Sequence, residues 1–127
     1  MHREISDFEI SFFEQLVKEK PNYIDALIPL AEAYTKSGLY DKGLQIDRRL
    51  VKLRKRDPIV HYNLACSLAL VGEKEKAIEI LERAIELGYS DFEHLKRDSD
   101  LKSLHGDLKF QSLLKPNIER SRRPPKK

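Results

Sequence analysis

The chain has 127 residues, of which 35% are charged and 40% apolar, and its net charge of +3 excludes a strong overall field of the kind that attracts nucleic acid. This length suits one domain with one core, and the single cysteine, Cys66, excludes an intrachain disulfide and a cysteine-based zinc cluster. No apolar run resembles a signal peptide or approaches the roughly 18 residues of a membrane span, so we expect a cytoplasmic protein without a membrane segment.

Apolar residues recur at helical spacing along almost the whole chain, and no stretch alternates in the manner of a strand. The first helix is predicted over residues 8–20. Ser6 or Asp7 is its candidate N-cap, and Pro21 prevents the helix from continuing.

Two pairs of helices follow, over residues 24–57 and 58–91. Asp57 is placed to cap the second pair, and Pro58 to occupy its first helical position. The connections are only a few residues long, which makes sequential helices antiparallel neighbours. Each pair has an apolar face that its own two helices cannot bury, so we expect the pairs to stack.

The two pairs repeat at a distance of 34 residues. The stretch that begins at Pro29 reads PLAEAYTKSGLYDKG, and the stretch that begins at Asn63 reads NLACSLALVGEKEKA. Small residues stand where helices must approach closely, and Gly38 and Gly72 allow the turns between helices. The predicted core consists of Phe13, Leu16, Leu27, Leu30, Tyr34, Leu50, Leu64, Leu68, Leu81, Ala84 and Ile85.

A repeat of 34 residues with two helices per unit resembles the tetratricopeptide repeat family. The family's motif positions fall on Leu30, Ala31, Gly38 and Gly43 in one unit, and on Leu64, Ala65, Gly72 and Ala77 in the next. The resemblance implies an all-α fold over residues 1–114, in which antiparallel helix-turn-helix repeats stack as a short right-handed α-solenoid. Residues 92–114 resemble a degenerate helical cap with short helices opening at Asp91, Asp100 and Asp107. Residues 115–127 are basic and proline-containing, and they are predicted to be a disordered tail.

Two residues depart from the repeat frame. Asp47 stands where the equivalent positions carry Phe13 and Leu81. We expect a slight rotation of the helix to expose Asp47, the alternative being a partly buried carboxylate paired with His61. Pro29 lies inside the first helix of its repeat and is expected to bend that helix or delay its start.

No constellation of catalytic, cofactor-binding or metal-ligating residues emerges from the sequence. The four histidines show no close ligand spacing, and the Asp-Ser-Asp stretch at 98–100 lacks the following ligands and the glycine of a calcium loop. Cys66 is interpreted as a small buried or half-buried thiol. We therefore expect no enzyme, no cofactor and no metal.

Peptide or protein binding is the leading hypothesis, because stacked pairs form a concave surface from the first helix of each repeat. The alignment implied by the resemblance exposes nine residues there: Asp25, Ile28, Glu32, Thr35, Ile59, Tyr62, Asn63, Cys66 and Leu70. This mixed apolar and acidic groove suits a helix or an extended segment with apolar anchors and a basic flank, and Tyr62 is the first candidate contact. The simpler interpretation is that these side chains are only solvated. The partner is an unidentified protein or peptide, and a monomer is favoured.

The alternative is binding of nucleic acid or an acidic surface. One helix and its end carry Arg48, Arg49, Lys52, Arg54, Lys55 and Arg56, and the tail adds further cations. Acidic residues bracket this cluster and the aromatic residues used to stack single strands are missing, so a solvated face is preferred and nucleic acid is an unlikely partner.

Overall fold

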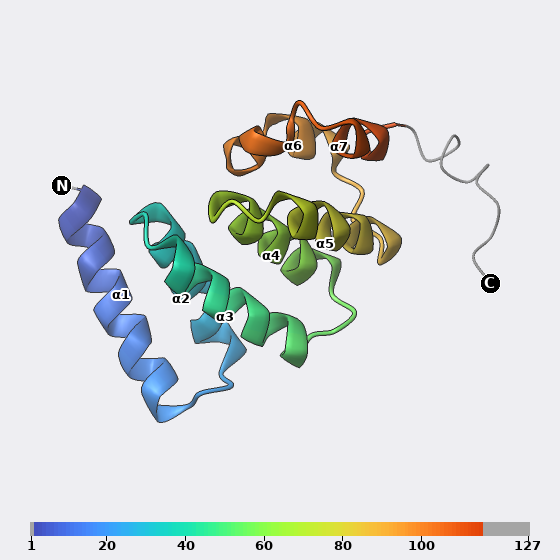
Figure 1. Cartoon of the computed structure of the whole chain (residues 1–127). Helices are drawn as coiled ribbons and strands as arrows, with labels where there is room; N and C mark the ends of the chain where they lie inside the picture. Colours follow the sequence, from blue (N-terminus) through green and yellow to red (C-terminus); the bar gives the residue numbers. More distant parts are fainter. Residues whose placement is uncertain (1, 116–127) are drawn as a thin grey trace.

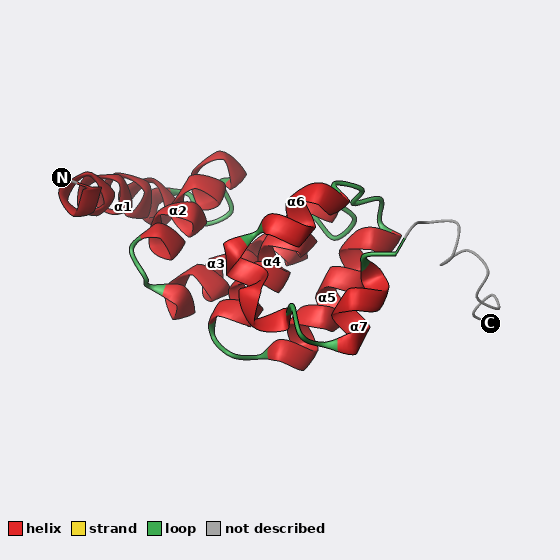
Figure 2. Ribbon diagram, turned by 90° about the horizontal axis from the view of Figure 1, so that it is seen from above, coloured by secondary structure: helices red, strands yellow, loops and turns green. Residues whose placement is uncertain are grey.

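The computed structural model describes residues 2–115, with side chains described from Asp7 onward. The predicted basic tail, residues 115–127, lies outside the described residues apart from Lys115. The described chain is helical and contains no strand, and Figures 1 and 2 show its helices stacked as successive antiparallel pairs. The elements are α1 (His2–Glu19), α2 (Ile24–Lys36), α3 (Tyr40–Leu53), α4 (Pro58–Leu70), α5 (Lys74–Glu86), α6 (Phe92–Arg97), the 3₁₀ helix η1 (Ser99–Leu104) and α7 (Leu108–Leu113). The predicted all-α repeat fold is confirmed.

The ends of the repeat helices follow from local chemistry. The Asp57 carboxylate accepts a hydrogen bond from the Ile59 N–H at 2.8 Å, and Pro58 opens α4 as predicted. Gly38 and Gly72 follow α2 and α4 with φ of 78° and 89°, a conformation that side chains with a Cβ rarely adopt. These two glycines fix the turn inside each pair.

Two local predictions are wrong, and one alternative is excluded. The first helix begins at His2 rather than at residue 8, so Ser6 and Asp7 lie inside α1 and do not cap it. The short helix η1 opens at Asp98, whose carboxylate accepts from the Asp100 N–H, so Asp100 is the capped residue and not the cap. Of the two alternatives for Pro29, a bend or a delayed start of the helix, the delay is excluded, because α2 begins five residues earlier at Ile24.

The core runs through the stack as two clusters that meet at Val51. The first joins α1, α2 and α3 with Val60 of α4, and the second joins α4, α5 and the C-terminal segment with Leu44 of α3. Most of the predicted core is buried, whereas Phe13, Leu16 and Ile85 are only partly buried. Gly43 confirms the need for small residues, because a Cβ there would lie 3.1 Å from the Thr35 hydroxyl of the neighbouring helix.

The C-terminal cap, which we define as residues 92–114, is buried more deeply than the sequence indicated. It contributes four of the largest fully buried side chains in the described chain: Leu95, Leu101, Leu104 and Phe110. Through η1 this cap packs against α4. The cap is therefore part of the core and forms one side of the site described next.

No helix in the described range combines the length and the apolar character that crossing a lipid bilayer requires.

Candidate functional site

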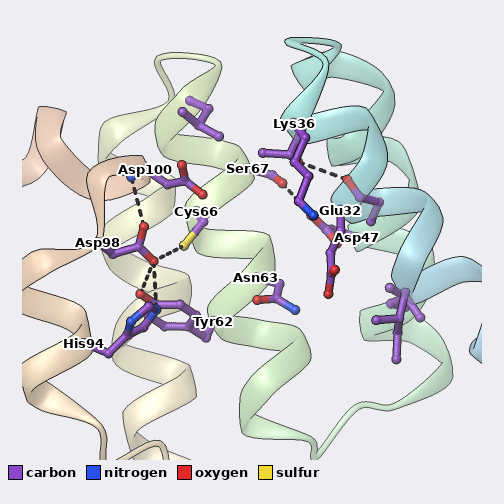
Figure 3. A pocket seen from close by; sticks show the side chains of 15 residues that line it. Glu32, Lys36, Asp47, Tyr62, Asn63, Cys66, Ser67, His94, Asp98 and Asp100 are labelled. Atoms are coloured by element: carbon purple, nitrogen blue, oxygen red, sulfur yellow. Dashed lines mark hydrogen bonds and ion pairs between the residues drawn. The ribbon is translucent and has the colours of Figure 1, made fainter. Parts of the chain in front are cut away.

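A groove with a volume of about 270 Å³ lies between α2, α4 and the C-terminal cap. We call it the α2–α4 groove (Figure 3). From α2 it receives Ile28, Ala31, Glu32, Thr35 and Lys36, and from α4 it receives Tyr62, Asn63, Cys66, Ser67 and Leu70. The remaining lining residues are Asp47 and Leu50 of α3 and His94, Asp98 and Asp100 of the cap. Apolar and acidic side chains thus share one groove.

Asp98 ties the cap to α4 at one end of the groove. One carboxylate oxygen accepts the Asp100 N–H at 3.0 Å and so caps η1. The other accepts the Tyr62 hydroxyl at 2.5 Å and the Cys66 thiol at 3.6 Å, and it lies 3.2 Å from the His94 Nε2 atom. Both oxygens are therefore engaged, and one side chain fixes both the start of η1 and its position against α4.

This environment makes Tyr62 and Cys66 unreactive. Burial is the largest effect that raises the pKa of the Tyr62 hydroxyl and that of the Cys66 thiol, and the charge of Asp98 raises both further. The ring of Tyr62 also stacks on Tyr89, with centroids 4.4 Å apart and planes 5° from parallel. A nucleophilic cysteine needs a lowered pKa, so Cys66 is packed as a structural thiol.

Asp47 lies at the other end of the groove and is 4% exposed. The predicted exposure of this side chain is wrong, and the alternative of a buried, paired carboxylate is correct only in part. Its partner is the Ser67 hydroxyl, which donates to it across the boundary between the repeats. His61 instead places its Nε2 atom 2.8 Å from the Lys55 carbonyl oxygen. Burial raises the pKa of Asp47 from 3.8 to about 6, against the lowering effect of the Ser67 hydrogen bond and with a further rise from Glu32.

The groove collects seven of the nine side chains predicted for the binding surface: Ile28, Glu32, Thr35, Tyr62, Asn63, Cys66 and Leu70. Asp25 and Ile59 do not line it; both are exposed elsewhere on α2 and α4. The predicted exposure of Tyr62 and Cys66 on this surface is wrong, since only 5% and 7% of their surfaces are accessible, whereas the interpretation of Cys66 as a buried or half-buried thiol is confirmed. The cap covers both side chains, so the main role of Tyr62 is structural and not contact with a partner.

The sequence reasoning missed the residues that the cap brings to the groove. His94, Asp98 and Asp100 are distant from α4 in the chain, and the Asp-Ser-Asp stretch was considered only as a calcium loop. Donor atoms of Cys66, Asp98 and Asp100 lie within 4.8 Å of one another, the spacing of possible metal ligands. Because both oxygens of Asp98 already accept hydrogen bonds, the contact between the cap and α4 accounts for this group.

The basic cluster occupies α3 and the turn that follows it. Arg48, Arg49, Lys52, Arg54, Lys55 and Arg56 are all exposed, while the same helix turns Asp47 and Leu50 inward. Arg49 donates a hydrogen bond to the Pro21 carbonyl at 3.2 Å and so connects α3 to the turn before α2. One of the six cations therefore has a structural contact.

Comparison with known proteins gives relatives of one structural type. No family model matches the chain. It is 27% identical over 85 residues to a chloroplastic protein of Arabidopsis thaliana, covering 65% of this chain and 25% of that protein. It is 29% identical over 119 residues to Superkiller protein 3 of Saccharomyces cerevisiae, covering 87% of this chain and 8% of that protein. The chain thus spans a quarter or less of the length of these curated relatives.

A solved structure has the same fold. The structure of MamA 41-end from Desulfovibrio magneticus RS-1 superposes with a TM-score of 0.67 at 18% identity, covering 95% of this chain and 70% of that one. The two relatives contain tetratricopeptide repeats, and MamA is a tetratricopeptide-repeat protein. The findings support a family of the tetratricopeptide-repeat type, and the fold is a solenoid of that type.

Proposed function

We propose that this chain, a helical solenoid of the tetratricopeptide-repeat type, is a non-enzymatic scaffold or adaptor that binds a peptide or helix of a partner protein in the α2–α4 groove. The observation that carries the proposal is the mixed lining of the groove, where the partly buried Ile28 and Leu70 share the surface with Glu32 and Asp100. Apolar walls with a few placed polar groups are the usual make-up of a binding site, because the first supply affinity and the second orientation.

The groove is also formed before a partner arrives. Asp98 fixes the cap against α4 through the Tyr62 hydroxyl, and Ser67 ties α4 to Asp47 of α3. Walls that are held by buried hydrogen bonds lose little freedom on binding, and this favours affinity. A preformed groove on a rigid stack is what a scaffold needs.

Two titratable groups of the groove, the Cys66 thiol and the Tyr62 hydroxyl, lack the activation that a catalytic role needs. A nucleophile or a general base is activated by a pKa shifted toward its working pH. Burial shifts the pKa of the Cys66 thiol and of the Tyr62 hydroxyl upward and away from that range. A fold of this type is also typical of non-enzymatic scaffolds.

The experiment is a selection of random peptides displayed on phage against the full chain, with affinities then measured by fluorescence polarisation. Asn63 lies half-buried in the groove, so Asn63→Trp fills the groove without a change of charge. Its matched control is Asn22→Trp in the exposed turn before α2. We expect Asn63→Trp to weaken the selected peptides at least about tenfold and Asn22→Trp to leave them unchanged. Equal binding by the two variants would exclude the α2–α4 groove as the binding surface.

A further inference from the structure

Asp47 is a buried carboxylate at a position that the repeat normally fills with an apolar side chain. The equivalent residue 34 positions later is Leu81, which is fully buried. Asp47 is buried almost as deeply, at 4% exposure, yet it lines the α2–α4 groove. A carboxylate in such a place lowers stability unless something compensates its charge.

The described chain supplies little compensation. The Ser67 hydroxyl donates one hydrogen bond to Asp47, and within residues 7–115 no lysine, arginine or histidine forms an ion pair with it. The charged group that acts on it most is Glu32, which has the same sign. Buried carboxylates are ordinarily paired with a cation, so Asp47 lacks the partner that its position calls for.

The rest of the groove has the chemistry of a long cationic side chain. Ile28 lines the same groove as Asp47 and is only partly buried, so it offers apolar contact there, whereas Ala31 and Leu50 are covered. Figure 3 shows Glu32 and Asp47 on one side of α4, and Asp98 and Asp100 on the other. Lysine and arginine combine an aliphatic stem with a positive head, so they bury the stem against apolar surface while the head reaches a carboxylate. The lining is complementary to that combination.

We infer that the segment bound in the α2–α4 groove carries a lysine or arginine whose stem packs against Ile28 and whose cationic head pairs with Asp47. This inference rests on the proposed peptide-binding function and deepens it by naming the side chain that is recognised. Asp47 is then the residue that sets specificity, and Glu32 adds attraction at the rim of the groove.

Lys36 is the one groove-lining lysine, and it provides a test in the opposite direction. It is exposed, and Figure 3 shows its side chain directed toward the part of the groove that holds Glu32 and Asp47. The positive charge of Lys36 repels a second cation that approaches the same carboxylates. Removing the charge with Lys36→Gln therefore raises the affinity for a basic segment, whereas Asp47→Asn lowers it.

The test uses the same displayed random peptides, with parallel selections on the full-length wild type, Asp47→Asn and Asp41→Asn. Asparagine keeps an acceptor for the Ser67 hydroxyl, so Asp47→Asn removes the charge and preserves the hydrogen bond. Asp41→Asn is the matched control, because Asp41 is an exposed residue of the same helix outside the groove. Thermal melts of the three proteins confirm that each is folded at the selection temperature.

Sequencing of the selected pools should show one position enriched in lysine and arginine with the wild type and with Asp41→Asn, and not with Asp47→Asn. For one such peptide, Asp47→Asn should weaken binding about tenfold or more. For the same peptide with norleucine in place of the lysine or arginine, Asp47→Asn should change the affinity by less than about twofold.

The remaining outcomes are distinct. Peptides that bind the groove without a basic preference, or with the same preference in Asp47→Asn, overturn this inference and leave the proposed function standing. A selection that yields no peptide sensitive to Asn63→Trp overturns the proposed function, and this inference with it.

Discussion

Helices α2 and α4 occupy the same place in the two repeats, yet their surroundings differ. α2 buries six of its 13 residues on one face, whereas α4 buries nine of 13 on almost every side. The difference arises because η1 packs on α4 as a third neighbour beside α3 and α5, whereas α2 packs mainly against α1 and α3. Ile28 and Glu32 of α2 consequently remain accessible in the groove, whereas their equivalents Tyr62 and Cys66 are covered.

The comparison teaches that a position in the repeat does not by itself determine exposure. The exposure of a helix depends on the element that follows it in the stack and packs against it. For α4 that element is the degenerate cap. The same cap turns the second repeat into the more tightly held half of the groove, through Asp98 and its bonds to Tyr62 and Cys66. The first repeat keeps the accessible half, with Glu32 and the buried carboxylate of Asp47.

The largest effect should come from the apolar anchor of the second repeat. Leu81 is fully buried among α4, α5 and their neighbours, so Leu81→Ala should lower the free energy of unfolding by about 2–5 kcal/mol. Urea denaturation followed by circular dichroism measures the loss.

The equivalent change in the first repeat, Asp47→Ala, should lower stability less, because the wild-type carboxylate is itself unfavourably buried. Equal losses for the two variants would show that the repeats are anchored alike and would remove the distinction between them.

A second change should make α4 resemble α2. Asp98→Ala removes the cap of η1 and leaves the Tyr62 hydroxyl without its acceptor, so we expect a loss of roughly 2–3 kcal/mol. Loosening of the cap should also expose Cys66, the only thiol in the chain, and speed its reaction with a disulfide reagent.

Asp107→Ala is the matched control for Asp98→Ala. It removes the side-chain cap of α7 and touches nothing in the groove, so it should cost about 1 kcal/mol and leave the labelling rate of Cys66 unchanged. If the two variants label at the same rate, the covering of α4 does not depend on Asp98.

A smaller effect should come from a single hydroxyl. Tyr62→Phe keeps the ring on Tyr89 and removes only the donor to Asp98, so it should cost about 1 kcal/mol in a thermal or urea melt.

Its counterpart in the first repeat is Tyr34→Phe, which removes the hydrogen bond to Glu14. Because Glu14 is exposed, water replaces the lost donor and the loss should be smaller. A larger loss of stability in Tyr34→Phe than in Tyr62→Phe would show that the tyrosine hydroxyl contributes more in the first repeat than in the second.

The sequence predicted those parts of the molecule that depend on local chemistry. The 34-residue period, the turns at Gly38 and Gly72 and the cap at Asp57 are properties of neighbouring residues, and the structure has all of them. They are sufficient to predict the stack of helices and most of its core.

The surface of the groove was less predictable, because it depends on contacts between distant segments. The exposure of Tyr62 was wrong because 36 residues separate it from Asp98, the residue that holds the cap over it. The burial of Asp47 was missed because its partner Ser67 lies 20 residues away on the next repeat. Asp47 itself was recognisable as a departure from the repeat, and that signal did indicate an unusual site.

The smallest effect concerns Asp47 and the pH dependence of stability. In the folded chain its pKa is about 6, and in the unfolded chain the carboxyl returns to about 3.8. Between these values the folded state holds more protons than the unfolded state, so the free energy of unfolding rises as the pH falls through about 6 and levels off below about 4.

Thermal melts of the wild type and of Asp47→Asn at a series of pH values isolate this contribution, since the other titrating groups are common to both proteins. Glu32 is the titrating neighbour that acts on Asp47, and it is present in both. From about pH 7.5 to about pH 5.5 the wild type should gain up to roughly 1 kcal/mol relative to Asp47→Asn. Leu81 provides no titrating group at the equivalent place in the second repeat, so Leu81→Met should show no such dependence. A pH-independent difference between the wild type and Asp47→Asn would mean that Asp47 ionises as freely as in water. In that case its burial does not distinguish the two repeats.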